Sequence, residues 1–301
     1  MAARSKALFD PRDGFTLIEL SIVLVIIGLV VGGVLVGRDL IKAAEVRATV
    51  SQIEKLRTAM NTFYGKYGYL PGDIPNPYAS QFGFAARGSL GGQGDGNGVI
   101  IGDANNDGPV AHVQCAGETP MVWVDLSTAK LIDGNFNSAS ETASNPTAVT
   151  GAGFDMWFPQ AKLGGGNYII VEPGDGSIGQ PVNVNFFDLV APTLLPAGCS
   201  GDLMSYSGVT AAQAHGIDLK IDDGLPQEGG VLAGGMSNGS SHFWAAGGSA
   251  SGADPGTAAP ASSITCFDNG GTASAPMRYS LATNGGAGIN CALSFKFLAG
   301  D

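Results

Sequence analysis

A long apolar run near the N-terminus dominates the hydropathy pattern of the chain. Residues 15–36 form 22 consecutive positions with one ionisable side chain, Glu19. A helix rises about 1.5 Å per residue, so a helix of this length crosses the roughly 30 Å hydrocarbon core of a bilayer. A carboxylate in lipid needs a cationic partner, and the run contains no Lys or Arg. The candidate partner is the new α-amino group that a cut before Phe15 would create.

The pattern changes to an amphipathic helix over residues 38–67. Apolar side chains recur there at spacings of three and four, at Val46, Val50, Ile53, Leu56, Met60, Phe63 and Tyr67. Residues 15–70 contain no proline, so the spacing predicts a single helix of about 80 Å over residues 15–67. The run Tyr69-Leu70-Pro71-Gly72-Asp73 ends it, because proline removes a helical hydrogen bond and glycine permits a turn.

The remainder of the chain is predicted to be a loop-rich β head. We expect a helical segment over residues 119–133, with Trp123 in the core. We also expect a surface loop over residues 135–153 and a long mobile loop or linker over residues 234–265. Short β-prone segments lie at residues 167–171, 182–187, 216–221, 278–282 and 292–298. The predicted fold class is therefore α+β: a long N-terminal helix whose second half packs against an antiparallel sheet.

Composition and charge favour a head outside the cytoplasm. The chain has 301 residues, 47 glycines and a net charge of −11. Removing residues 1–14 takes away three basic and two acidic side chains, which leaves −12. An acidic surface disfavours nucleic acid as a partner. The basic residues before the apolar run should stay in the cytoplasm, so the cysteines of the head would face an oxidising compartment.

The residues Gly14-Phe15-Thr16-Leu17-Ile18-Glu19-Leu20 carry a family resemblance. They resemble the processing site of type IV pilins and of the pseudopilins of type II secretion. The resemblance implies that prepilin peptidase cuts between Gly14 and Phe15 and methylates Phe15, and that Glu19 pairs with the N-terminus of a neighbouring subunit during assembly. A secretory signal peptide has a shorter apolar core, and a plain signal anchor does not explain Glu19.

The resemblance also implies how the chain divides. Residues 1–14 would be a leader, 15–37 a transmembrane and filament-core helix, 38–68 an amphipathic helix, and 69–301 the head. Many type IV pilins carry a proline in the apolar half, and this chain does not. Small residues form a strip along that half, which either allows close helix packing or reflects the tolerance of membrane helices for glycine: Gly28, Gly32, Gly33 and Gly37.

Calcium is a candidate ligand of the head. Asp103, Asn105 and Asp107, followed by Gly108, match the first half of an EF-hand loop, in which oxygen ligands alternate before a sharp turn. The second half does not match, because Gln114 stands where the bidentate glutamate should be. Some pseudopilins carry calcium in the head, but an Asn/Asp/Gly turn that binds nothing is the alternative.

Two further groups of residues are candidates for a structural role. Asp218, Asp222 and Asp223 lie at a predicted strand-to-turn junction. Clustered carboxylates can serve acid/base catalysis or hold a cation, but an Asp-Asp-Gly turn is the commoner explanation. Four cysteines allow three pairings. Cys266–Cys291 would resemble the C-terminal disulfide loop of many pilins, and Cys115–Cys199 would remain.

No catalytic motif stands out. His112, His215 and His242 are isolated, and the sequence lacks a Walker loop. We therefore expect a non-catalytic filament subunit, anchored in the bacterial inner membrane and then assembled with other subunits into a periplasmic or extracellular filament. The alternatives are a minor or tip subunit whose head binds a ligand or surface, and a signal-anchored periplasmic protein that does not polymerise.

Overall fold

The computed structural model describes most of the chain after the predicted leader. The chain forms two compact units, residues 1–44 and 45–301. The described residues are 15–88, 92–102, 114–137, 139, 147–174, 184–199, 203–236, 242–243 and 260–297.

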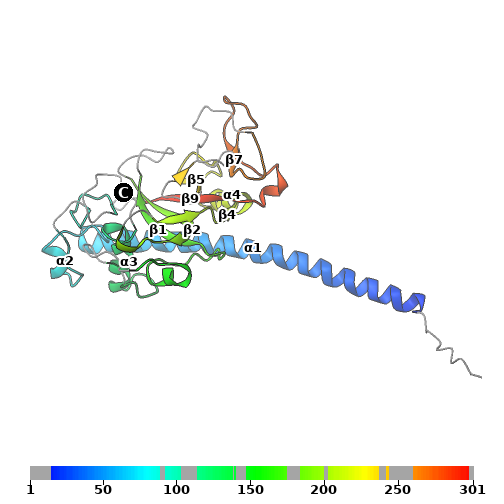
Figure 1. The fold of residues 1–301 in the computed structure, drawn as a ribbon, viewed down its shortest axis with the longest axis horizontal. Coiled ribbons are helices and arrows are strands. Elements are labelled where there is room, and N and C mark those ends of the chain that lie inside the picture. The colour runs from blue at the N-terminus through cyan, green and yellow to red at the C-terminus, as the bar shows by residue number, and fades with distance from the viewer. Residues whose placement is uncertain are drawn as a thin grey trace, which may run out of the picture. The chain divides into compact units, whose positions relative to one another are not determined.

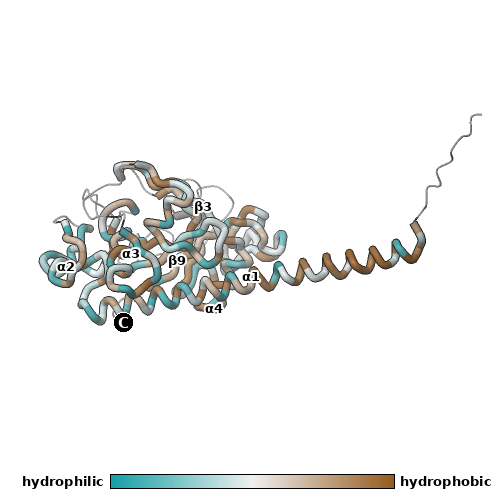
Figure 2. Tube along the Cα trace, turned by 90° about the horizontal axis from the view of Figure 1, so that it is seen from below, coloured by the Kyte–Doolittle hydropathy of each residue, from teal (hydrophilic) through white to brown (hydrophobic). Residues whose placement is uncertain are grey.

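Helix α1 (Leu17–Tyr67) is continuous over 51 residues, which confirms the single long helix. No side chain between Phe15 and Ala44 is buried, and the large apolar side chains there are half to nine-tenths exposed. In Figure 2 this part of α1 is coloured as hydrophobic along most of its length. It is long and apolar enough to cross a membrane, with a mean hydropathy of 2.9 over its most apolar window.

The second half of α1 belongs to the second unit and has one buried face. That face holds Val46, Thr49, Ile53, Leu56, Ala59, Met60 and Phe63. Five of the seven apolar positions predicted from the spacing are on this face, while Val50 and Tyr67 are partly buried beside it. The Arg57 guanidinium on the same helix donates a hydrogen bond of 2.9 Å to the carbonyl oxygen of Lys296 in the sheet.

The head is built on an antiparallel sheet that lies across the second half of α1 (Figure 1). Its path is β1 (Tyr168–Pro173), β2 (Asn185–Leu194), β9 (Ile289–Phe297), β5 (Val231–Met236) and β6 (His242–Phe243). β3 (Met204–Tyr206) pairs with β2, and β4 (Val209–Thr210) pairs with β9. In the centre, Phe187, Phe295 and Val231 are in register on three adjacent strands and fully buried. The predicted α+β fold is therefore confirmed.

Short helices surround the sheet. α3 (Glu118–Thr128) confirms the helical segment expected after residue 119, and its Trp123 is fully buried against Phe136 and Phe187. The others are α2 (Tyr78–Gln81), α4 (Ala211–Ile221) and the 3-10 turns η1 (Gly151–Met156), η2 (Ala197–Cys199) and η3 (Asn284–Gly286). β7 (Phe267–Asp268) and β8 (Arg278–Tyr279) form a separate ribbon.

The strand predicted at residues 216–221 is wrong, because this segment is the second half of α4. Thr210 and Gln213 form a capping box at its start, in which each side chain bonds the backbone N–H of the other residue. Ala211, Ala214 and Ile217 then fall on one buried helical face. The spacing of three and the Thr-x-x-Gln signature are both visible in the sequence. The prediction gave more weight to the β-branched residues Ile217 and Ile221, which favour a strand.

Other predicted boundaries also shift. The strand predicted at 182–187 begins at Asn185 and continues to Leu194, and the one predicted at 278–282 is only the two residues of β8. The predicted loop at 234–265 contains the end of β5 and all of β6, whose few backbone pairs extend the sheet. Residues 237–241 and 244–259 of that loop lie outside the described residues.

Candidate functional site

The start of α1 places Glu19 in a local hydrogen-bond network. The backbone N–H and the hydroxyl of Thr16 each donate to Glu19 Oε2 over 2.8 Å, and the Glu19 N–H donates to the Thr16 hydroxyl over 3.3 Å. This is the reciprocal pattern of a capping box, whose Thr-x-x-Glu signature the sequence interpretation missed. The candidate assembly carboxylate is thus exposed and presented at the first turn of the helix.

The glycine strip of α1 has no packing role within the described chain. A Cβ added at Gly28, Gly32, Gly33 or Gly37 would meet nothing within 4 Å. The neighbouring apolar side chains are equally unpartnered, as Leu24 is 69% exposed and Leu29 is 73% exposed. Within the described residues this surface is therefore uncovered.

An acidic cluster in the head was not recognised from the sequence. Asp73, Asp95 and Glu118 each place a carboxylate oxygen within 4.8 Å of the others. Asp73 follows α1, Asp95 lies in the Gly94–Gly98 turn, and Glu118 begins α3. Asp73 and Glu118 are 1% and 0% exposed, whereas Asp95 is exposed.

Backbone N–H groups satisfy the buried carboxylates of this cluster. Asp73 accepts from Gly96 and Gly98 over 2.6 and 2.8 Å, and Glu118 accepts from Gly94 and Ile101 over 2.9 Å. Burial raises the pKa of Asp73 to about 7, and the charge of Asp95 adds to this effect. Burial and the charge of Asp73 raise the pKa of Glu118 well above its usual value.

The chemistry of the cluster fits either a shared proton or a hard cation, because carboxylate oxygens are the ligands that calcium prefers. Each carboxylate oxygen of Asp73 and Glu118 already accepts an N–H bond. These bonds therefore connect the glycine-rich turn to α3 without a cation. The calcium prediction concerned other residues, Asp103, Asn105 and Asp107, which lie outside the described residues together with Gly14.

Beside this cluster lies a buried ion pair. The guanidinium of Arg87 donates to Asp125 Oδ2, and both side chains are essentially inaccessible to solvent. The same oxygen accepts the Gly72 N–H over 2.6 Å. Gly72 has a φ of +89°, and a Cβ there would lie 2.5 Å from the Glu118 carbonyl oxygen. Glycine at this position therefore allows the turn after α1 to approach α3.

Asp218, Asp222 and Asp223 are brought together at the end of α4, where their carboxylate oxygens lie within 4.8 Å of one another. Asp218 accepts from the Tyr279 hydroxyl over 2.7 Å, and burial raises its pKa to about 6. Asp222 accepts from the Gly230 and Val231 N–H groups, and Asp223 accepts from Leu225 over 2.7 Å. The bonds to Asp222 and Asp223 come from backbone N–H groups of the turn after α4, and a turn is the commoner explanation predicted for this cluster.

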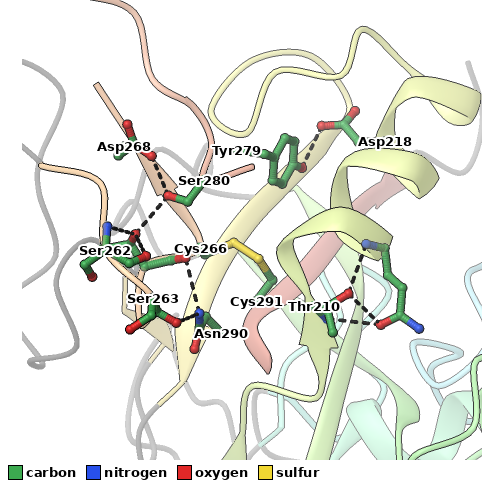
Figure 3. Close-up of a disulfide and its surroundings, with 12 residues drawn as sticks. Thr210, Asp218, Ser262, Ser263, Cys266, Asp268, Tyr279, Ser280, Asn290 and Cys291 are labelled. Atoms are coloured by element: carbon green, nitrogen blue, oxygen red, sulfur yellow. Dashed lines mark hydrogen bonds between the residues drawn. A yellow bond between two sulfur atoms is a disulfide. The ribbon is translucent and has the colours of Figure 1, made fainter. Parts of the chain in front are cut away.

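A disulfide links Cys266 to Cys291 beside α4 (Figure 3). It joins the start of the β7–β8 ribbon to β9, and it is the pairing expected from the sequence. Asn290 Nδ2 adds a bond of 2.9 Å to the Ser263 carbonyl oxygen, and Ser280 donates to Asp268 over 2.6 Å. Cys115 is also disulfide-bonded. The pairing of Cys115 with Cys199 remains a prediction.

Comparison with protein families identifies one feature of the chain. Residues 11–35 match the family model of the prokaryotic N-terminal methylation motif, which is the signature of type IV pilins and pseudopilins. The match covers the predicted cut, Phe15, Glu19 and most of the apolar run. The signature belongs to structural proteins rather than to catalytic ones. Neither the curated proteins nor the solved structures contain a match to this chain.

Proposed function

We propose that this chain, which carries the methylation signature of pilin precursors, is a structural subunit of a type IV pilus-like or type II secretion pseudopilus filament. One observation supports this most strongly. The matched motif leads directly into a helix whose side chains stay unburied through Ala44, although most of them are apolar. Such a helix is complete only when lipid or neighbouring helices cover it.

The proposed mechanism starts from a precursor in the inner membrane. The basic residues before Gly14 stay in the cytoplasm and the head lies outside. Prepilin peptidase cuts between Gly14 and Phe15 and methylates the new N-terminus. The exposed half of α1 then leaves the lipid and joins a helical bundle with other subunits, and the head serves no catalytic role.

The driving force for this transfer comes from packing and charge. Apolar side chains exchange lipid for other apolar side chains, so the hydrophobic contribution nearly cancels. Close helix contact at the glycine strip remains, together with an ion pair between Glu19 and the amine of a neighbour. The hydrogen bonds from Thr16 fix the Glu19 carboxylate at the start of the helix. Formation of the ion pair therefore costs little additional side-chain entropy.

Two measurements test this function. Mass spectrometry of the mature chain should find methylated Phe15 at the N-terminus, and an intact Met1–Gly14 segment would contradict the proposal. Glu19→Ala should leave insertion and cutting intact but lower filament yield at least tenfold, because one ion pair in lipid is lost. Asp39→Ala is the matched control, as Asp39 is another exposed carboxylate on α1. Equal filament yields from the two variants would contradict the assembly role of Glu19.

A further inference from the structure

A groove runs along the solvent side of α1 within the second unit. It has a volume of about 570 Å³ and lies between α1, the segment after α3 and the loop before β1. Gln52 ties two of its walls together: Nε2 donates to the Gln160 carbonyl oxygen over 2.9 Å, and Oε1 accepts the Lys162 N–H over 2.8 Å. A second hollow of about 450 Å³ shares Ser51, Lys55 and Leu131 with it, so the groove continues along the helix.

The groove is basic on an acidic protein. Lys55, Lys130 and Lys162 line it, and all three are exposed. They are three of the six lysines in residues 45–301, a region where acidic residues outnumber basic ones by 22 to 10. Asp133 is the one carboxylate in the lining of the larger hollow, and Glu54, which forms an ion pair with Arg57, is the one in the lining of the smaller hollow. The half-buried Leu131 and Ile132 add apolar surface beside these charges.

The same chain carries an acidic counterpart, the turn formed by residues 222–228. Asp222, Asp223 and Glu228 are exposed in it, and Lys220 is the nearest basic residue in sequence. The turn is held by the bonds from Gly230 and Val231 to Asp222 and from Leu225 to Asp223. A preorganised turn loses little conformational entropy when it binds.

We propose that the basic groove binds the acidic turn of a second copy of this chain. Heads with a large negative charge repel one another, and a contact between opposite charges is what allows them to pack closely. Because the groove and the turn share no residue, each copy can use both surfaces at once. Such a heterologous contact propagates along a filament instead of closing a dimer. The proposal rests on the filament function proposed above.

The contact can be tested in cells that make the full-length chain and process it. A photo-crosslinking amino acid at Thr58, an exposed residue of the groove lining, should capture a peptide containing residues 222–228. The pair Lys130→Glu/Lys162→Glu and the pair Asp223→Lys/Glu228→Lys should each lower this crosslink and the filament yield at least tenfold. Co-production of the two variants should restore the crosslink between them. Arg47→Glu/Lys66→Glu is the control, because it makes the same change in net charge on α1 outside the groove.

Each outcome separates this contact from the filament function. If the wild type polymerises but the crosslink falls on another protein, or only the lysine variant is impaired, the groove binds a different acidic partner and the proposal is overturned. If both charge-reversed pairs assemble normally, the groove binds no neighbour. Neutral Lys130→Gln/Lys162→Gln variants, checked for an unchanged melting temperature, exclude misfolding as the cause of a loss. A processed wild type that never polymerises would overturn the filament function and this contact with it.

Discussion

The two halves of helix α1 differ in whether their apolar side chains are buried. In residues 15–44, the exposed half, no side chain is buried. In residues 45–67, the buried half, Ile53, Met60 and Phe63 are completely inaccessible to solvent. Both halves have the same backbone conformation, so the difference lies in what surrounds them. The buried half is covered by its own head, whereas nothing in the described chain covers the exposed half.

The comparison predicts the largest effect for an apolar truncation in the buried half. Phe63→Ala removes a ring that packs against Tyr67 and Phe84, and it should lower the free energy of unfolding by about 3–5 kcal/mol. Leu29→Ala in the exposed half is the matched control and should change it by less than about 0.5 kcal/mol. Thermal or urea unfolding of the detergent-solubilised chain measures both. Similar losses in the two variants would show that the exposed half packs on the head.

The Cys266–Cys291 disulfide should stabilise the head without any contribution from the exposed half of α1. It closes a loop with a sequence separation of 25, and a loop of that size contributes about 3 kcal/mol. Cys266→Ser/Cys291→Ser should therefore lower the melting temperature of the head and increase amide exchange in residues 260–297. Leader removal should be unchanged. An unaltered melting temperature would show that the hydrogen bonds around the bridge hold this region without it.

A pH effect should also be confined to the head. Because burial raises the pKa of Asp73 to about 7, the folded head binds this proton more tightly than the unfolded chain does. The stabilisation is fully present below about pH 4 and is lost as the pH rises through 7, so the melting temperature should fall between pH 5 and pH 8. A change of 1 kcal/mol corresponds to roughly 2–4 °C in a domain of this size.

Asp73→Asn should reduce this slope, with Asp133→Asn as the control because Asp133 is exposed and lies outside the cluster. The measurement is made in EDTA, so that a bound cation does not replace the proton. A melting temperature that rises from pH 5 to pH 8, or an unchanged slope in Asp73→Asn, would assign the pH dependence to other groups.

The smallest effect on stability is expected from the glycine strip. Gly32→Ala/Gly33→Ala adds methyl groups that meet nothing within the chain, so the melting temperature of the head should stay the same. Filament yield should fall several-fold if neighbouring helices approach at this strip. Gly65→Ala, where an added Cβ also meets nothing, is the control in the buried half. Unchanged assembly in the first variant would favour simple tolerance of glycine in a membrane helix.

The parts of the fold that depend on local pattern were predictable from the sequence. The single helix, its buried face and its end before Pro71 follow from apolar spacing and from proline chemistry. α4 was missed although its Thr210–Gln213 capping box is a local signal. Residues 216–221, taken without the residues before them, have the composition of a short strand. The Asp73–Asp95–Glu118 cluster was not predictable, since its members are separated by more than 20 residues and only folding brings them together.

The sequence by itself determined that this chain carries an N-terminal methylation motif, one long helix and a β-rich head, because hydropathy patterns and short motifs depend on a few neighbouring residues. The tertiary structure decided which half of the helix is covered, which carboxylates are buried and where the lysines form a groove. Those properties depend on contacts between segments that are distant in the chain, and local pattern carries no information about their distances.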